Sequence, residues 1–473
     1  GLISVTGCID AQKSQMIYAF GGHRKNKLIV TFGEQKAKEL YDEYSFFDKE
    51  VVYYPSKDVL FYQSDIRGNL LTAERIRALK AIREQERVTL VTTFDALMNT
   101  MAPIEKMWEN VLTLEQGQLL DLKEIQAALI RMGYEKEYQV QTMGQFSVRG
   151  GILDVFPLTE ENPIRIELWG DEIDTIRYFD CESQKSIENT DRVSIYPAAE
   201  IVLSGQEKLK AEAKRVSDKL RKQMKTEEAH RVSVMADELT EEWGELSMYA
   251  GMDAFLSYFF DERVGLLDYF KPSDSLIFFD ELTRCAEQGK LTETEFSESM
   301  KQRLAMGYIL PGQMNGLFTE KEIVAKLEKY SCIALGALDK ANGLHQLGSY
   351  GIHCQSVSPY NNSFELLIKD LKRYKKNGYR VILLSGSRTR AKRLSEDITD
   401  QGITCFYTEN YDHELFEGQI MVCYGKVRRG FEYPILKFAV ITESDIFGAQ
   451  QKKKKRHRTY EGEKIQSFTD LSV

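Results

Sequence analysis

Residues 2–14 read Leu2-Ile3-Ser4-Val5-Thr6-Gly7-Cys8-Ile9-Asp10-Ala11-Gln12-Lys13-Ser14, a pattern typical of a strand, a glycine-containing loop and the start of a helix. The last eight residues match the phosphate-binding motif GxxxxGK[ST] except that Gln12 replaces the second glycine. That glycine lets backbone N–H groups curl around phosphate oxygens, whereas glutamine adds a Cβ and a long side chain there. We therefore predict a degenerate nucleotide site that includes Gly7, Gln12, Lys13 and Ser14.

Two carboxylates extend this predicted site. The apolar run 276–279 predicts a buried strand that ends on Asp280 and Glu281, where nucleotide hydrolases carry a Mg²⁺-binding aspartate and a neighbouring glutamate. A one-mismatch motif and an acidic pair after a strand each arise by chance, but here both occur in the order that these enzymes use. Hydrolysis also needs an arginine from a second lobe, and no QxxGRxxR motif follows the segment 426–432. We expect no catalytic residue and no cofactor.

The alternation of apolar and amphipathic segments predicts an α/β fold. Strand-like runs at 2–6, 27–31, 51–54 and 88–93 are separated by helical patterns, which is typical of a parallel sheet with crossover helices. We interpret this part as a degenerate RecA/helicase-like P-loop lobe. From about Gly144 the pattern changes to short alternating strands, which predicts a compact α+β insert. A second Rossmann-like α/β lobe is predicted from the strands and helices between 332 and 447.

The length of 473 residues suggests about three structural units, because domains average roughly 150 residues. We predict a P-loop lobe whose first part is 1–106, an α+β insert at 107–197, and the second part of the same module at 198–331. A Rossmann-like domain would occupy 332–448. A basic linker or tail at 449–473 contains the run 452–458, which a solvated linker or a local nucleic-acid contact would both explain.

Composition excludes several classes of protein. The net charge of −9 argues against a general nucleic-acid coat. Seven scattered cysteines without a CxxC pair indicate reduced thiols, and six dispersed histidines predict no metal site. No apolar run approaches the roughly 18 residues of a membrane helix. We expect a cytoplasmic chain, and its ends, Gly1 and Val473, suggest a piece of a longer protein.

Several stretches resemble a known family. The segments 146–157 (FSVRGGILDVFP), 164–173 (IRIELWGDEI) and 177–180 (RYFD) are similar to the insert shared by the excinuclease subunit UvrB and the transcription-repair coupling factors, known as Mfd. The segments 54–62, 65–69, 92–97 and 441–448 resemble the coupling factors in particular. UvrB has a tyrosine-rich hairpin after the equivalent of Tyr54, for which this sequence leaves no room. The resemblance covers nearly the whole chain.

The resemblance implies a UvrB-like module followed by a third domain, ending before the RNA-polymerase-interacting domain and the DNA translocase motor. It implies that the module does not hydrolyse ATP, and that the insert recruits UvrA to stalled transcription complexes. The family's UvrA-contacting positions match Arg149, Arg165 and Trp169, the last replacing the usual phenylalanine. RNA polymerase and DNA would be partners of the parent protein. In the family a distant C-terminal domain covers the UvrA patch, so we expect an exposed patch here.

The insert can also be interpreted from its residues. Ile164, Ile166 and Leu168 alternate with Arg165, Glu167 and Trp169, which predicts a strand with one apolar and one polar face. Gly170 and Asp171 fit a two-residue hairpin turn. Tryptophan and arginine on an exposed strand are residue types enriched in binding hot spots. The simpler interpretation is that Trp169 packs under a neighbouring loop and the arginines form local ion pairs.

Two other functions compete with an adaptor that binds UvrA. The first is a weak ATPase or helicase that tolerates Gln12. The second is a nucleic-acid-binding module that uses Arg428, Arg429 and the basic run 452–458. Saturable ATP binding would favour the first, and a DNA complex that survives about 150 mM salt would favour the second.

Overall fold

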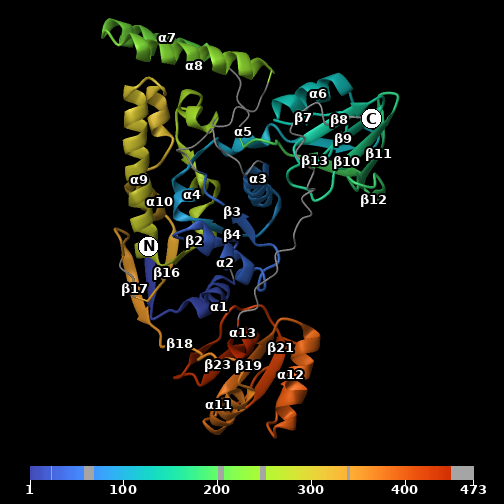
Figure 1. Cartoon of the computed structure of the whole chain (residues 1–473), viewed down its shortest axis with the longest axis vertical. Helices are drawn as coiled ribbons and strands as arrows, with labels where there is room; N and C mark the ends of the chain where they lie inside the picture. Colours follow the sequence, from blue (N-terminus) through green and yellow to red (C-terminus); the bar gives the residue numbers. More distant parts are fainter. Residues whose placement is uncertain (23, 58–68, 201–206, 246–251, 338–340, 449–473) are drawn as a thin grey trace, which may run out of the picture. The chain divides into compact units, whose positions relative to one another are not determined.

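The computed structural model describes residues 1–22, 24–57, 69–200, 207–245, 252–337 and 341–448 (Figure 1). The chain divides into two compact units, residues 1–354 and 355–473. The predicted basic run 452–458 and the segment 65–68 lie outside the described residues. Within the described part, no helix is both long and apolar enough to cross a lipid bilayer.

The first unit is built on a seven-stranded sheet in which every pair of neighbouring strands is parallel. From one edge to the other, its strands are β17 (Gln346–Gly351), β1 (Leu2–Thr6), β16 (Ser331–Leu335), β15 (Ser275–Asp280), β2 (Asn26–Thr31), β4 (Val88–Thr93) and β3 (Val52–Tyr54). The predicted α/β class is confirmed. Parallel neighbours require crossover connections, and these bring the carboxyl ends of β1 and β15 to one edge.

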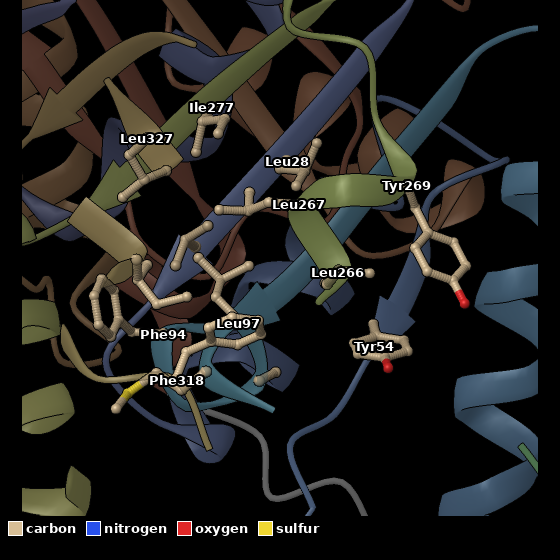
Figure 2. Packing of buried hydrophobic residues seen from close by; sticks show 14 of the residues in the cluster. Leu28, Tyr54, Phe94, Leu97, Leu266, Leu267, Tyr269, Ile277, Phe318 and Leu327 are labelled. Carbon is tan, nitrogen blue, oxygen red and sulfur yellow. The ribbon is translucent and has the colours of Figure 1, made fainter. Parts of the chain in front are cut away.

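Apolar side chains cover both faces of this sheet. Ile29 and Phe278 belong to a core on one face with α1 (Asp10–Gly21) and α2 (Glu34–Tyr44). Leu28 and Ile277 point into the larger core on the other face, where Phe94, Leu97, Leu266 and Phe318 pack (Figure 2). The helices that contribute to this larger core include α3 (Asn69–Glu84), α4 (Phe94–Met98), α5 (Ile104–Trp108), α9 (Leu282–Ala305) and α10 (Glu320–Leu327). Burial on both faces explains why the inner strands, such as β15 (SLIFFD), are mostly apolar.

The insert is a six-stranded sheet with its own core. Its strand order is β12 (Ser186–Asn189), β11 (Glu172–Phe179), β10 (Ile164–Trp169), β9 (Ile152–Val155), β8 (Gln145–Arg149) and β7 (Glu135–Lys136). A separate pair is formed by β6 (Leu112–Glu115) and β13 (Arg192–Ile195). Helix α6 (Leu122–Arg131) contributes Leu129 to the core, and Ala73 and Ile76 of α3 join it. The alternation predicted for 164–169 is present, since Ile164 and Ile166 are buried.

The charged segment after the insert forms two helices. They are α7 (Glu207–Lys222) and α8 (Thr226–Glu245), which contact each other along their length. Leu209, Ala213 and Val232 lie in a small core that Phe255 and Leu310 complete. The short strands β5 (Thr100–Met101) and β14 (Val264–Gly265) pair with each other. Short 3₁₀ helices lie at 252–258, 266–269, 272–274 and 311–315.

The second unit contains a six-stranded sheet with helices packed on one face. Its strand order is β18 (Gln355–Ser356), β22 (Phe431–Tyr433), β23 (Phe438–Thr442), β19 (Arg380–Ser385), β21 (Ile420–Tyr424) and β20 (Phe406–Tyr407). Its core joins alternate residues of β19, β21 and β23 to α11 (Phe364–Lys376) and α12 (Arg388–Asp400). Helix α13 (Glu443–Phe447) follows β23.

One boundary differs from the predicted position. We placed the start of the last domain at residue 332, but β16 and β17 pair with β1 in the first sheet. The second compact unit begins at Gln355. A buried parallel strand looks alike in either lobe, so the apolar run 331–335 does not reveal which sheet it joins. The division at 106/107 and 197/198 stays a prediction.

Candidate functional site

The degenerate phosphate loop is short, and two of its backbone N–H groups already donate hydrogen bonds within the protein. Helix α1 begins at Asp10, so the connection from β1 consists of Gly7, Cys8 and Ile9. The N–H groups of Gly7 and Cys8 donate to the carbonyl oxygens of Ala337 and Gly336, each at 3.1 Å. A phosphate cradle needs free N–H groups that point at the anion. In this loop two of those donors are satisfied by the chain that follows β16.

Gln12 and Ser14 are buried inside this region. The amide nitrogen of Gln12 lies 3.1 Å from the sulfur of Met16, while its Oε1 atom has no hydrogen-bond partner among the described residues. The hydroxyl of Ser14 donates to Glu43 at 3.1 Å. In a working site the hydroxyl at this position binds Mg²⁺. Here the Ser14 hydroxyl instead donates its hydrogen bond to a carboxylate of α2.

Lys13 connects the loop to the predicted carboxylates. Its buried ammonium donates to Asp280 at 2.5 Å, to Glu281 at 2.8 Å and to Asp10 at 3.0 Å. The second oxygen of Asp280 accepts a hydrogen bond from Thr31 at 3.1 Å. Oxygens of the three carboxylates that bind Lys13 lie within 4.8 Å of one another, as in a divalent-cation site. The lysine ammonium supplies the positive charge that a metal ion would bring.

These ion pairs change the acidity of the groups involved. Burial opposes the charged form of Lys13, but Asp280, Glu281 and Asp10 outweigh it and raise the lysine pKa above its ordinary value. Burial also opposes the charge of Asp10, yet Lys36 and Lys13 lower the pKa of Asp10 to about 2. Lys13 and Asp10 are therefore both charged at neutral pH. The structure brings Lys13, Asp280 and Glu281 together, as the motif order predicts.

Gly7 has a structural reason to be glycine. Its φ of +77° lies in the left-handed region, and a Cβ at this position would meet the carbonyl oxygen of Ile352 at 2.2 Å. The N–H of Ile352 donates to Thr6 at 2.9 Å, which ties the end of β17 to the end of β1. Close backbone packing thus requires a glycine here without any phosphate.

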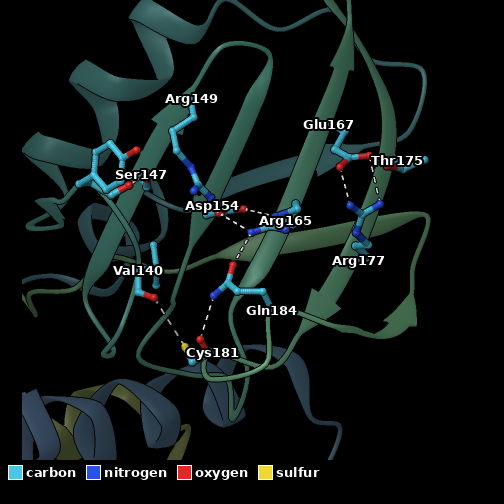
Figure 3. A network of polar contacts seen from close by, with 11 residues as sticks. Val140, Ser147, Arg149, Asp154, Arg165, Glu167, Thr175, Arg177, Cys181 and Gln184 are labelled. Carbon is cyan, nitrogen blue, oxygen red and sulfur yellow. Dashed lines mark hydrogen bonds and ion pairs between the residues drawn. The ribbon is translucent and has the colours of Figure 1, made fainter.

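In the insert, the predicted arginines meet at a buried carboxylate (Figure 3). Asp154 of β9 is 1% exposed and accepts hydrogen bonds from Arg165 at 2.7 and 2.8 Å and from Arg149 at 2.8 Å. Arg165 also donates to Gln184 at 2.9 Å and lies over the ring of Phe179. Its hydrogen bonds to Asp154 outweigh burial and raise the pKa of Arg165. The local ion pairs proposed by the simpler interpretation are present.

Trp169 does not pack under a loop. Its side chain is 84% exposed at the end of β10, next to the turn of Gly170 and Asp171. Register places Arg165 opposite Asp154, and Arg149 opposite Ile152, which itself faces Glu167. Because alternate residues share one face of a sheet, Arg149, Arg165 and Trp169 project on the same side. This is the polar face of the sheet, and the side chain of Arg149 is more than a third exposed on it.

Comparison with known proteins finds similarity in the insert and along most of the chain. Residues 112–201 match the family model of the UvrB interaction domain. The chain aligns with the transcription-repair-coupling factor of Bacillus subtilis strain 168, with 28% identity over 456 residues that cover 94% of this chain and 38% of that protein. The coupling factor of Staphylococcus haemolyticus is 28% identical over 487 residues, covering 100% of this chain and 40% of the relative.

The chain is similar to the transcription-repair-coupling factors over nearly its whole length. It spans about two fifths of the length of these relatives. The segment that matches the UvrB interaction domain includes Arg149, Arg165 and Trp169 together with Asp154. The candidate binding surface therefore lies within the matched domain, whereas the Lys13 cluster lies outside it.

The sequence interpretation missed Asp154. This residue stands between the buried Leu153 and Val155, and a carboxylate inside an apolar strand needs a basic partner. That signal could have indicated an ion pair, although its partners could not be named from spacing.

Arg428 and Arg429, proposed for nucleic-acid binding, are exposed between β21 and β22. The second half of that proposed surface, the run 452–458, lies beyond the described chain.

Proposed function

We propose that this chain is a non-catalytic adaptor of transcription-coupled nucleotide excision repair, and that its insert recruits UvrA through Arg149, Arg165 and Trp169. The observation that carries the proposal is that these three side chains project from one face of a sheet within a UvrB interaction domain. Asp154 holds the two arginines in place, and Trp169 offers a large exposed ring. Arginine and tryptophan are typical interface anchors.

The remainder of the first unit acts as a scaffold in this proposal. The Lys13 ammonium is bound by three carboxylates, and the N–H groups of Gly7 and Cys8 are bound by carbonyl oxygens. ATP would have to break these contacts before its phosphates could bind. We therefore propose that the unit neither binds nor hydrolyses ATP. In a longer parent protein, RNA polymerase and DNA would bind through other regions.

Binding of purified UvrA to the chain tests the adaptor proposal. The double variant Arg165→Ala, Trp169→Ala should bind UvrA at least 10-fold more weakly, because truncation of an interface anchor costs about 1–3 kcal/mol. A matched control is the double variant Arg131→Ala, Tyr138→Ala, which removes an exposed arginine and an exposed aromatic ring elsewhere in the insert. Equal UvrA affinity in the two double variants would refute the proposed site.

Calorimetric titration tests the scaffold part. Mg²⁺ and ATP should give no saturable heat with the unaltered chain. Saturable binding that Lys13→Ala abolishes would show a working nucleotide site and would contradict the proposal. The two measurements are independent, so the adaptor surface and the inactive loop can each be refuted separately.

A further inference from the structure

A second exposed apolar side chain lies beside the tip of the β10–β11 hairpin. Leu119 is 75% exposed, comparable to Trp169 at 84%. The segment around Leu119 pairs with the hairpin, since Leu120 donates to the carbonyl of Asp171 at 2.7 Å and Ile173 donates to that of Gln118 at 2.9 Å. Leu119 is therefore held by backbone hydrogen bonds, although its side chain is in solvent.

Register places three side chains in one row. Trp169 lies opposite Glu172 in the β10–β11 pair, and Leu119 lies opposite Glu172 in the next bridge. Residues opposite one another in a sheet project on the same face, about 5 Å apart. An exposed carboxylate consequently stands between an exposed indole ring and an exposed leucine. This row lies on the same face as Arg165 and Arg149.

The surface beside this row is acidic. A shallow hollow of 810 Å³ is lined by Trp169 and Glu172 and by the further acidic residues Glu115, Asp174 and Asp191. Arg192 also lines it and pairs with Glu115 at 3.2 Å. One arginine against four carboxylates leaves an excess of negative charge. A cation beside the face of an indole ring is attracted by both the ring and the carboxylates.

We propose that UvrA places a basic side chain against Glu172, between the apolar side chains of Leu119 and Trp169. This inference rests on the proposed function, because it extends the same interface by one row of the sheet. The partner surface must then offer an arginine or lysine flanked by apolar groups. The interface has two electrostatic halves: the arginines held by Asp154 face acidic groups of the partner, and Glu172 faces a basic one.

Affinity of purified UvrA for a graded set of variants tests this inference. Leu119→Ala should weaken binding about 5-fold or more. Glu172→Lys should lower the affinity for UvrA more than 10-fold, because two positive charges then meet. Glu172→Gln should lower this affinity by a smaller factor. The loss in Glu172→Lys should shrink between about 50 and 300 mM salt, since screening weakens charge repulsion.

Matched controls separate this interface from general damage. Ile187→Ala and Glu188→Lys change an exposed apolar and an exposed acidic residue of β12 and should leave affinity within 2-fold. Thermal unfolding should be unchanged in the variants of Leu119, Glu172, Ile187 and Glu188, because these four side chains are exposed. If Arg165→Ala, Trp169→Ala weakens binding but Leu119→Ala and Glu172→Lys do not, the inference fails and the adaptor proposal stands. Absence of UvrA binding by the unaltered chain overturns both.

Discussion

Arg165 donates two hydrogen bonds to Asp154, one from Nε at 2.7 Å and one from a terminal guanidinium nitrogen at 2.8 Å. The carboxylate is buried, whereas the guanidinium is partly exposed. Two parallel bonds fix the plane of the guanidinium as well as its position. A side chain that UvrA would contact is thus oriented before binding, so less conformational entropy is lost on association.

Removal of the carboxylate should destabilise the insert. Asp154→Ala leaves Arg165 and Arg149 without their shared acceptor, and we expect unfolding in urea to require about 2–4 kcal/mol less free energy. Asp154→Asn keeps an acceptor oxygen, so its free energy of unfolding should fall by less. UvrA affinity should fall in both variants. An unchanged urea midpoint for Asp154→Ala would show that the ion pairs contribute nothing to folding.

Gly7 should tolerate no side chain. Gly7→Ala would place a Cβ 2.2 Å from the carbonyl oxygen of Ile352, so we expect a loss of more than about 3 kcal/mol in the free energy of unfolding. Gly150→Ala is the control for backbone strain, because Gly150 also has a positive φ but has no atom within 4 Å of the added Cβ. The free energy of unfolding should fall by about 1 kcal/mol in Gly150→Ala. Equal losses would mean that the contact with Ile352 is unimportant.

Restoration of the missing glycine should not restore nucleotide binding. In Gln12→Gly the N–H groups of Gly7 and Cys8 still donate to carbonyl oxygens, and Lys13 still binds its carboxylates. Calorimetry with Mg²⁺ and ATP should therefore remain flat. Saturable binding by Gln12→Gly would instead show that the Gln12 side chain alone blocks the site.

Glu200 should make the first unit sensitive to acid. Burial opposes its charge, but Arg75 and Lys57, which bind it at 2.7 and 2.8 Å, lower its pKa from 4.5 to about 2. A lowered pKa contributes stability that is complete above about pH 4.5 and is lost as the pH falls towards 2. The contribution is about 3 kcal/mol.

Urea unfolding at pH 7 and pH 3 tests this dependence. The unaltered chain should lose more stability between these values than Glu200→Gln, which has no carboxylate to protonate at this position. The variant should be less stable at pH 7, and the difference between the two proteins should narrow at pH 3. A constant difference would contradict the assigned role of Glu200.

Local patterns in the sequence determined the strand, loop and helix of residues 2–14, the α/β class and the polar face that carries Arg165 and Trp169. These features depend on near neighbours in the chain, because strand and helix periodicities decide which residues share a face. The replacement of glycine by Gln12 likewise needs no structure to be seen.

Tertiary structure alone decided which distant groups meet. Asp280 reaches Lys13 across 267 positions of sequence, Ile352 closes on Gly7, and Leu119 joins the row of Trp169 and Glu172. Such contacts depend on strand order and register, which local periodicity does not encode. For the same reason the run 331–335 looked like the start of a second lobe, although it lies between β1 and β15 in the sheet of the first unit.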